Sequence, residues 1–107
     1  MAKQTDNYEA LAQLFHILGD RTRLRILMAL QSGKLNVTQL CKALKAPQPT
    51  VSRHLGIMRM AGLLVNRRNG KEIFYRLSDA PGPGSARSLR SLLDSARALC
   101  PERAGRH

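Results

Sequence analysis

The chain has 107 residues, of which 43% are hydrophobic and only four are aromatic, so it can form one small domain with an aliphatic core. Eighteen Lys and Arg residues against seven Asp and Glu residues give a formal net charge of +11, which favours a polyanionic partner such as nucleic acid over a role in solubility alone. The polar start is unlike a signal peptide, and no run approaches the roughly 18 apolar residues of a membrane span, so we expect a cytoplasmic protein with reduced cysteines and no membrane partner.

The first third of the chain predicts two helices. After a loose tail at residues 1–4, a helix over about 5–18 begins at a Thr5 or Asp6 cap. Its apolar residues follow the spacing of an amphipathic helix: Tyr8, Leu11, Ala12, Phe15 and Leu18. A second helix begins at the Asp20 cap and ends near Gln31. Its residues Arg23 and Arg25 could face phosphate, but we expect each to be solvated.

The middle of the chain predicts a helix-turn-helix. A third helix over about 37–44 begins at an Asn36 or Thr38 cap, and residues 45–47 form the turn. A fourth helix runs from about residue 48 to Met60, with Pro49 in its first turn, where no backbone N–H is needed.

A basic hairpin and a last helix complete the pattern. Segments 63–68 and 72–77 are β-prone and flank Asn69-Gly70, which predicts a two-residue type I′ turn. The Pro- and Gly-rich segment 80–84 separates the hairpin from a helix over about 85–99. The basic tail at 101–107 is expected to be disordered.

This order of elements predicts a mainly α fold with a small β-hairpin, the winged helix-turn-helix. We expect a single domain over 1–107, with a DNA-binding core at about 20–79. Such a fold places one helix in the DNA major groove and a hairpin beside it.

Five separated motifs resemble the ArsR/SmtB family of bacterial winged-helix repressors. They lie at residues 18–27, 38–41, 48–55, 61–63 and 70–77. The resemblance implies a homodimer whose interface is formed by the first and last helices, at about 5–18 and 85–99. It also implies repression that is relieved by an effector, and a twofold dimer predicts an inverted-repeat operator in double-stranded DNA.

The N-terminal end of the fourth helix carries the side chains suited to base reading. These are Gln48, Thr50, Ser52, Arg53 and His54. Gln can read adenine, Arg can read guanine, and Ser or Thr can contact a base or a phosphate. The alternatives are that Ser52 contacts phosphate only and that the His54 ring packs against the third helix.

The hairpin is strongly basic around its turn, with Arg67, Arg68 and Lys71, followed by Arg76. We expect these side chains to contact the DNA backbone or the minor groove and to make binding salt-sensitive. The alternative is a solvated sheet edge protected by charge.

The sensing residues are less clearly indicated. Cys41 matches the first cysteine of the Cys-x-Cys pair that metal-sensing relatives carry, but Ala43 replaces the second, and the last helix has no His. We therefore expect no metal site and no cofactor. A subgroup of the family senses oxidants or reactive sulfur with one cysteine on the third helix and one at the end of the last helix. This resemblance makes Cys41 and Cys100 candidate thiol sensors. Cys41 could equally be a plain core residue.

Other function classes remain as alternatives. No catalytic constellation or cofactor fingerprint occurs, so we expect no enzyme. A metal-responsive or effector-independent repressor of the same family, a winged-helix module that binds a protein, and a non-specific architectural DNA binder stay open.

Overall fold

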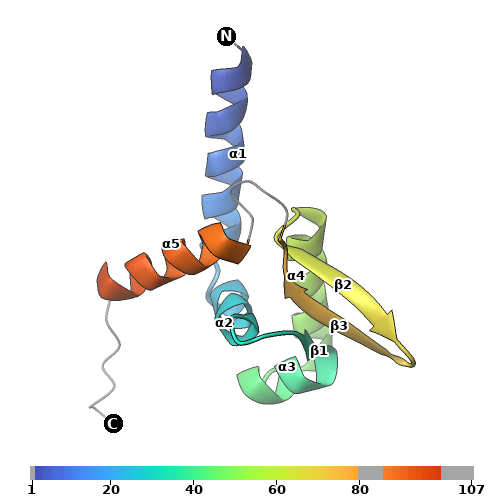
Figure 1. Cartoon of the computed structure of the whole chain (residues 1–107). Helices are drawn as coiled ribbons and strands as arrows, with labels where there is room; N and C mark the ends of the chain where they lie inside the picture. Colours follow the sequence, from blue (N-terminus) through green and yellow to red (C-terminus); the bar gives the residue numbers. More distant parts are fainter. Residues whose placement is uncertain (1, 80–85, 100–107) are drawn as a thin grey trace.

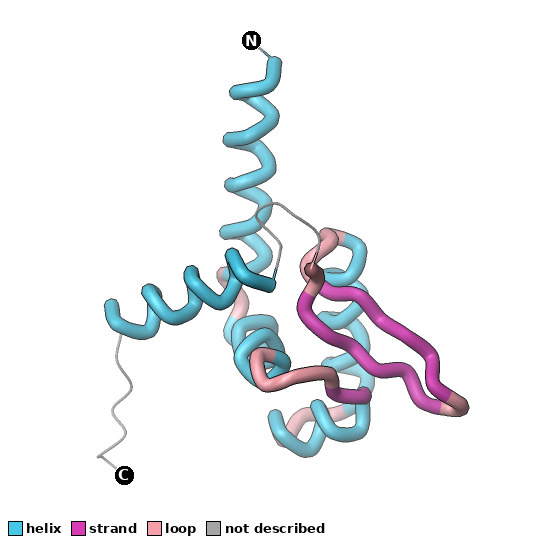
Figure 2. Tube along the Cα trace, viewed as in Figure 1, coloured by secondary structure: helices cyan, strands magenta, loops and turns pink. Residues whose placement is uncertain are grey.

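The computed structural model describes residues 2–79 and 86–99, and the side chains of residues 8–79 and 88–99. Its elements are α1 (Ala2–Leu18), α2 (Arg21–Leu30), β1 (Leu35–Asn36), α3 (Val37–Leu44), α4 (Gln48–Met60), β2 (Leu64–Asn69), β3 (Glu72–Leu77) and α5 (Ala86–Leu99). Helices α2, α3 and α4 lie together, and the β2–β3 hairpin projects from them (Figure 1). In the view of Figure 2, the strands and α5 lie on opposite sides of the molecule. This is the winged helix-turn-helix arrangement predicted from the sequence.

The core is aliphatic, as the composition predicted. Its fully buried side chains come from α2, α3, α4, β2 and α5: Ile26, Leu27, Leu30, Leu40, Val51, Leu55, Met58, Leu64 and Leu89. Burial of a side chain of this size contributes roughly 1.5–3 kcal/mol. The core therefore holds the helix-turn-helix, the base of the hairpin and the start of α5 in one unit.

Caps fix the helix starts at the predicted residues. The Arg23 backbone N–H donates to Asp20 Oδ1 at 3.0 Å, so Asp20 caps α2. Asn36 and Gln39 form a reciprocal capping box at the start of α3, with hydrogen bonds of 2.7 and 2.8 Å. Pro49 lies in the first turn of α4. Backbone N–H groups in this turn have no acceptor within the helix, so the N–H that proline lacks costs no hydrogen bond.

The sheet has three strands, whereas the sequence predicted a two-stranded hairpin. Strand order is β1-β3-β2, and all pairs are antiparallel. Leu35 pairs with Tyr75 and Asn36 with Phe74, so the two residues before α3 form a short third strand. Two residues are too few to show an alternating pattern, which explains why the sequence did not reveal β1.

The hairpin turn also lies one residue later than predicted. Asn69 pairs with Glu72, so Gly70 and Lys71 are the two turn residues. Gly70 has a φ of 69°, and it is the only residue of the turn with positive φ. The predicted type I′ turn at Asn69-Gly70 is wrong, because Gly at the first central position with positive φ is the pattern of a type II′ turn.

Helix α1 differs from its prediction at its start. It begins at Ala2 instead of a cap at residue 5 or 6, since Ala, Lys and Gln are good helix formers. Leu14, Ile17 and Leu18 are buried, whereas Tyr8 is 74% and Phe15 54% exposed. The predicted apolar face is therefore largely exposed in the single chain.

Helix α5 follows the predicted range and buries Leu89 and Leu93, while Leu99 is exposed. Segment 80–84, Ser85, Cys100 and the tail 101–107 lie outside the described residues. None of the helices in the described part of the chain has the length and apolar character to cross a membrane.

Candidate nucleic-acid interface

Helix α4 has one buried face and one solvent-exposed polar face at its N-terminal end. Val51, Leu55 and Met58 are completely buried against the core. Gln48, Ser52 and Arg53 are exposed, and Thr50 is half-buried. These four predicted contact residues therefore lie in the first two turns of the helix, where a recognition helix reaches base edges.

His54 is the exception among the predicted contact residues. Its side chain is only 4% exposed, because it follows Val51 by three residues on the inner face of the helix. Arg23 Nη1 on α2 lies 3.2 Å from His54 Nδ1. The structure thus buries His54 behind the exposed face of α4, where its ring contacts Arg23 of α2, and burial disfavours the expected base contact.

Burial lowers the pKa of His54 from its usual value of 6.5, and the positive charges of Arg53 and Arg23 act in the same direction. The negative charge of Asp20 opposes this shift. The pKa of Asp20 is lowered mainly by the hydrogen bond from the Arg23 backbone N–H, with help from the positive charge of Arg23. Together, Asp20, Arg23 and His54 form a polar cluster behind the recognition helix.

Two arginines of α2 bind the ends of neighbouring helices. Arg23 is half-buried, which corrects the expectation that it is solvated, whereas Arg25 remains exposed. Arg23 Nε donates to the carbonyl of Ile17 at 2.7 Å, in the last turn of α1. Arg25 Nη2 donates to the carbonyl of Leu44 at 2.9 Å, at the end of α3. A cation at a helix C-terminus is favourable because it satisfies a free carbonyl and complements the helix dipole.

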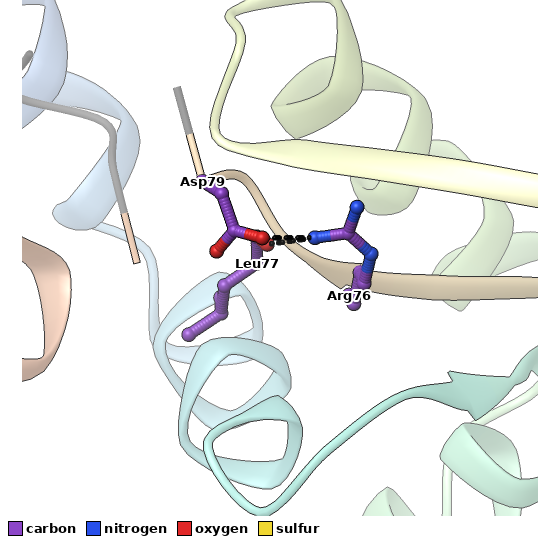
Figure 3. A network of polar contacts seen from close by, with 3 residues as sticks. All are labelled: Arg76, Leu77 and Asp79. Atoms are coloured by element: carbon purple, nitrogen blue, oxygen red, sulfur yellow. Dashed lines mark hydrogen bonds and ion pairs between the residues drawn. The ribbon is translucent and has the colours of Figure 1, made fainter. Parts of the chain in front are cut away.

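The hairpin presents the predicted cations to solvent. Arg67, Arg68 and Lys71 are all exposed, and Arg68 Nη1 makes a 3.4 Å contact with the carbonyl of Gly70. Among the described side chains, one ion pair occurs, between Arg76 and Asp79 (Figure 3). Arg67, Arg68 and Lys71 therefore have no carboxylate partner in the described part of the protein.

Sequence reasoning missed one cation beside the hairpin. Lys34 precedes β1, and its Nζ lies 5.2 Å from the centre of the Phe74 ring. Only the pairing of β1 with β3 places Lys34 beside the hairpin, and a strand of two residues is too short to be predicted from the sequence.

The candidate sensing residue Cys41 is a free, half-buried thiol on α3 that packs against the core. Cys100, its proposed partner, lies outside the described residues. Within the described ranges, no group of three or more His, Cys, Asp or Glu side chains is arranged to hold a metal ion.

The helix pair α3–α4, the exposed polar start of α4 and the basic hairpin define a winged helix-turn-helix protein. Residues 20–65 match the family described as "Bacterial regulatory protein, arsR family". The chain is 41% identical over 75 residues to an uncharacterized HTH-type transcriptional regulator of Methanocaldococcus jannaschii, covering 69% of this chain and 84% of that protein. The chain belongs to the ArsR family.

Two further comparisons bear on the family. Over 67 residues the chain is 52% identical to the arsenical resistance operon repressor of Escherichia coli, covering 62% of this chain but only 57% of the relative. The chain thus spans less than two thirds of that protein. The crystal structure of the transcriptional repressor BigR from Xylella fastidiosa superposes with a TM-score of 0.79 at 27% identity, covering 95% of this chain and 97% of that one.

Proposed function

We propose that the chain is a homodimeric, sequence-specific DNA-binding repressor of transcription. The observation that carries this proposal is the pairing of an exposed polar helix start on α4 with a hairpin whose cations Arg67, Arg68 and Lys71 lack carboxylate partners among the described residues. Unpaired cations beside a candidate recognition helix suit a duplex, because phosphate contacts position the protein while base contacts select the sequence.

The side chains divide between these two tasks. Gln48, Thr50, Ser52 and Arg53 are the candidates for base edges, and Arg53 has the strongest potential because a guanidinium can bind guanine in a bidentate manner. His54 has a supporting role, since it is buried behind this surface. The hairpin cations supply salt-sensitive affinity for the backbone.

The relatives support this proposal by their names. The E. coli relative is named a repressor of an arsenical resistance operon, and the Xylella protein is named a transcriptional repressor. Both descriptions agree with a regulator that acts on DNA.

The dimer is proposed from the exposed apolar side chains of α1. Tyr8, Leu11 and Phe15 are 74%, 43% and 54% exposed in the single chain, although they lie on one face of the helix. A second copy of the chain would bury this face, as the family resemblance implies for the first and last helices. An inverted-repeat operator follows from the twofold symmetry of such a dimer.

Binding of the chain to duplexes from its own promoter region tests the proposal. We expect an inverted-repeat duplex to bind about 1,000-fold or more tightly than a scrambled duplex at physiological salt. The Arg53→Ala variant should reduce this ratio, whereas Arg59→Ala, at the far end of the same helix, should leave it unchanged. A ratio near one would indicate an architectural DNA binder, and no binding to either duplex would indicate a protein-interaction module.

For the effector, we propose oxidation of Cys41 with Cys100. A peroxide would accept two electrons as both thiols lose their protons, giving one disulfide and two water molecules. Cys41 supports this proposal because it is free, half-buried and placed on α3, directly before the recognition helix. A metal-responsive repressor and a repressor without an effector are the alternatives.

The redox proposal is tested by mass spectrometry and operator binding, each with and without hydrogen peroxide or polysulfide. We expect a loss of two mass units with peroxide, from two hydrogen atoms, together with weaker DNA binding. Cys41→Ser should bind DNA normally and remain insensitive to oxidant. Retained regulation in this variant would exclude Cys41 as the sensor.

A further inference from the structure

A buried polar contact lies directly behind the reading end of α4. His54 is only 4% exposed, and it follows Arg53, the strongest candidate for a base contact. The half-buried Arg23 of α2 places its Nη1 3.2 Å from His54 Nδ1, while its Nε donates to the carbonyl of Ile17 at 2.7 Å. One guanidinium therefore contacts both the reading helix and the last turn of α1.

The contact between Arg23 and His54 exists only while the imidazole is neutral. A guanidinium has donors and no acceptor, so the ring nitrogen that faces it must offer a lone pair. Protonation places a hydrogen on this nitrogen, and the contact becomes a meeting of two donors that both carry positive charge. At 3.2 Å in a buried site such a pair is repulsive, so the ring and the guanidinium must separate.

The charged groups that act on the ring come from two helices. Arg53 of α4 and Arg23 of α2 disfavour a proton on His54, and burial acts in the same direction. Asp20 of α2 favours the proton, but its Oδ1 already accepts the Arg23 backbone N–H at 3.0 Å as the helix cap. Among the described residues, no charge on α3 or on the sheet contributes. The balance lowers the pKa of His54 from its usual value of 6.5, so the ring gains its proton only in acidic solution.

We propose that Arg23 and His54 position the reading end of α4, and that a proton on His54 breaks this arrangement and releases the operator. This inference rests on the proposed function. It makes acid a signal that acts without Cys41, because the switch needs no thiol.

The position of His54 on α4 connects its proton to base reading. Ser52 and Arg53 directly precede His54 in the same helix, so a displaced ring moves both side chains with it. Whichever partner of the contact moves, α4 loses its link to α2 and to α1. A shift of about 1 Å is enough to break hydrogen bonds to base edges. Contacts of the exposed hairpin cations with phosphate do not depend on this link, so acid should reduce sequence preference more than general affinity.

Affinity for the inverted-repeat duplex between pH 7.5 and pH 5.5 tests the switch. His54→Gln is the matched variant, because Gln accepts a hydrogen bond from Arg23 but does not titrate, and all other titrating groups are shared. The affinity of each protein is taken relative to its own value at pH 7.5. Where the wild-type ring is half protonated, we expect the wild type to have lost about fourfold more affinity than His54→Gln, twofold for each protomer. Circular dichroism should show that both proteins remain folded at each pH.

NMR titration of the His54 ring, with and without the inverted-repeat duplex, gives a second readout. Because linkage is reciprocal, a duplex that binds only the neutral form must lower the pKa of the ring in the complex. A ring that contacts phosphate would instead have a raised pKa in the complex, since a negative charge favours the protonated form. That result would overturn the switch.

The variant His54→Leu tests the positioning role at pH 7.5. Leu fills the buried site but offers Arg23 no acceptor, so we expect the preference for the inverted repeat over a scrambled duplex to fall about tenfold. Binding to the scrambled duplex should change by no more than about twofold, because phosphate contacts do not read bases. His54→Gln should restore most of the preference. An unchanged preference in a folded His54→Leu protein would contradict the positioning role, and if this variant does not fold, the pH comparison still decides.

The outcomes separate the switch from the proposed function. A wild type without preference for the inverted repeat at pH 7.5 would overturn both. A wild type that has this preference but shares its pH profile with His54→Gln would overturn the switch alone.

Discussion

Arg23 joins the recognition helix to the end of α1 through its contact with His54. Its Nη1 lies 3.2 Å from His54 Nδ1, while its Nε donates to the carbonyl of Ile17 at 2.7 Å. Because a guanidinium can only donate, Nδ1 must accept, so His54 is neutral and carries its proton on Nε2. One side chain of α2 therefore links the proposed dimer helix to the proposed DNA-reading helix.

Replacing Arg23 with Met should weaken this link. Met keeps much of the apolar stem but has no donor for Ile17 or His54, so we expect the free energy of unfolding to fall by about 1–3 kcal/mol in urea denaturation. Arg21→Met is the control, because Arg21 is exposed and should change the free energy by no more than about 0.5 kcal/mol. Equal effects of the two substitutions would show that the Arg23 contacts contribute no stability.

Acidification should destabilise the protein through His54. Burial lowers the pKa of His54 in the folded state below its usual value of 6.5, so the unfolded chain binds a proton at a higher pH than the folded one. The free energy of unfolding should therefore decrease as the pH falls below about 6.5, and level off for this group once the pH passes its folded-state pKa.

The variant His54→Gln should lack this part of the pH dependence. Gln can accept a hydrogen bond from Arg23 but does not titrate. Urea denaturation of both proteins between pH 7.5 and pH 5 provides the measurement. Asp20 does not confound it, because its pKa is lowered from 3.8 and its stabilising effect is lost only at lower pH. Parallel pH profiles for the two proteins would contradict the role of His54.

The sequence predicted the order of the five helices and the hairpin because their signals are local. Asp20 and Asn36 are capping residues directly before apolar helical patterns, and Pro49 is suited to a first turn. The exposed start of α4 followed from the same reasoning, since Val51 and Leu55 define its buried face.

The features that the sequence did not reveal depend on contacts between distant residues. His54 has the polarity of a DNA contact, and only the position of Arg23, 31 residues earlier, shows that it is satisfied inside the protein. Likewise, the apolar pattern of α1 does not distinguish a face buried in the core from one left for a partner. Lys34 joins the hairpin surface only because β1 pairs with β3.

The hairpin cations should contribute affinity without sequence preference. The double variant Arg67→Ala/Arg68→Ala should weaken binding to operator and scrambled duplexes by a similar factor, because phosphate contacts do not read bases. The slope of log K against log salt should fall by about two for each protomer. Unchanged salt dependence in fluorescence anisotropy titrations would remove the hairpin from the proposed interface.

A charge on the exposed face of α1 should dissociate the proposed dimer. Phe15 is 54% exposed in the single chain, yet it lies one turn from Leu11 on the same apolar face. Phe15→Glu would bury an unpaired carboxylate at the twofold interface, so sedimentation should show a monomer at concentrations where the wild type is a dimer. Gln13→Glu adds the same charge at another exposed position of α1 and should leave the dimer intact. Because each protomer reads one half-site, the Phe15→Glu chain should also bind the inverted repeat more weakly than Gln13→Glu. A dimer that persists in Phe15→Glu would place the interface elsewhere.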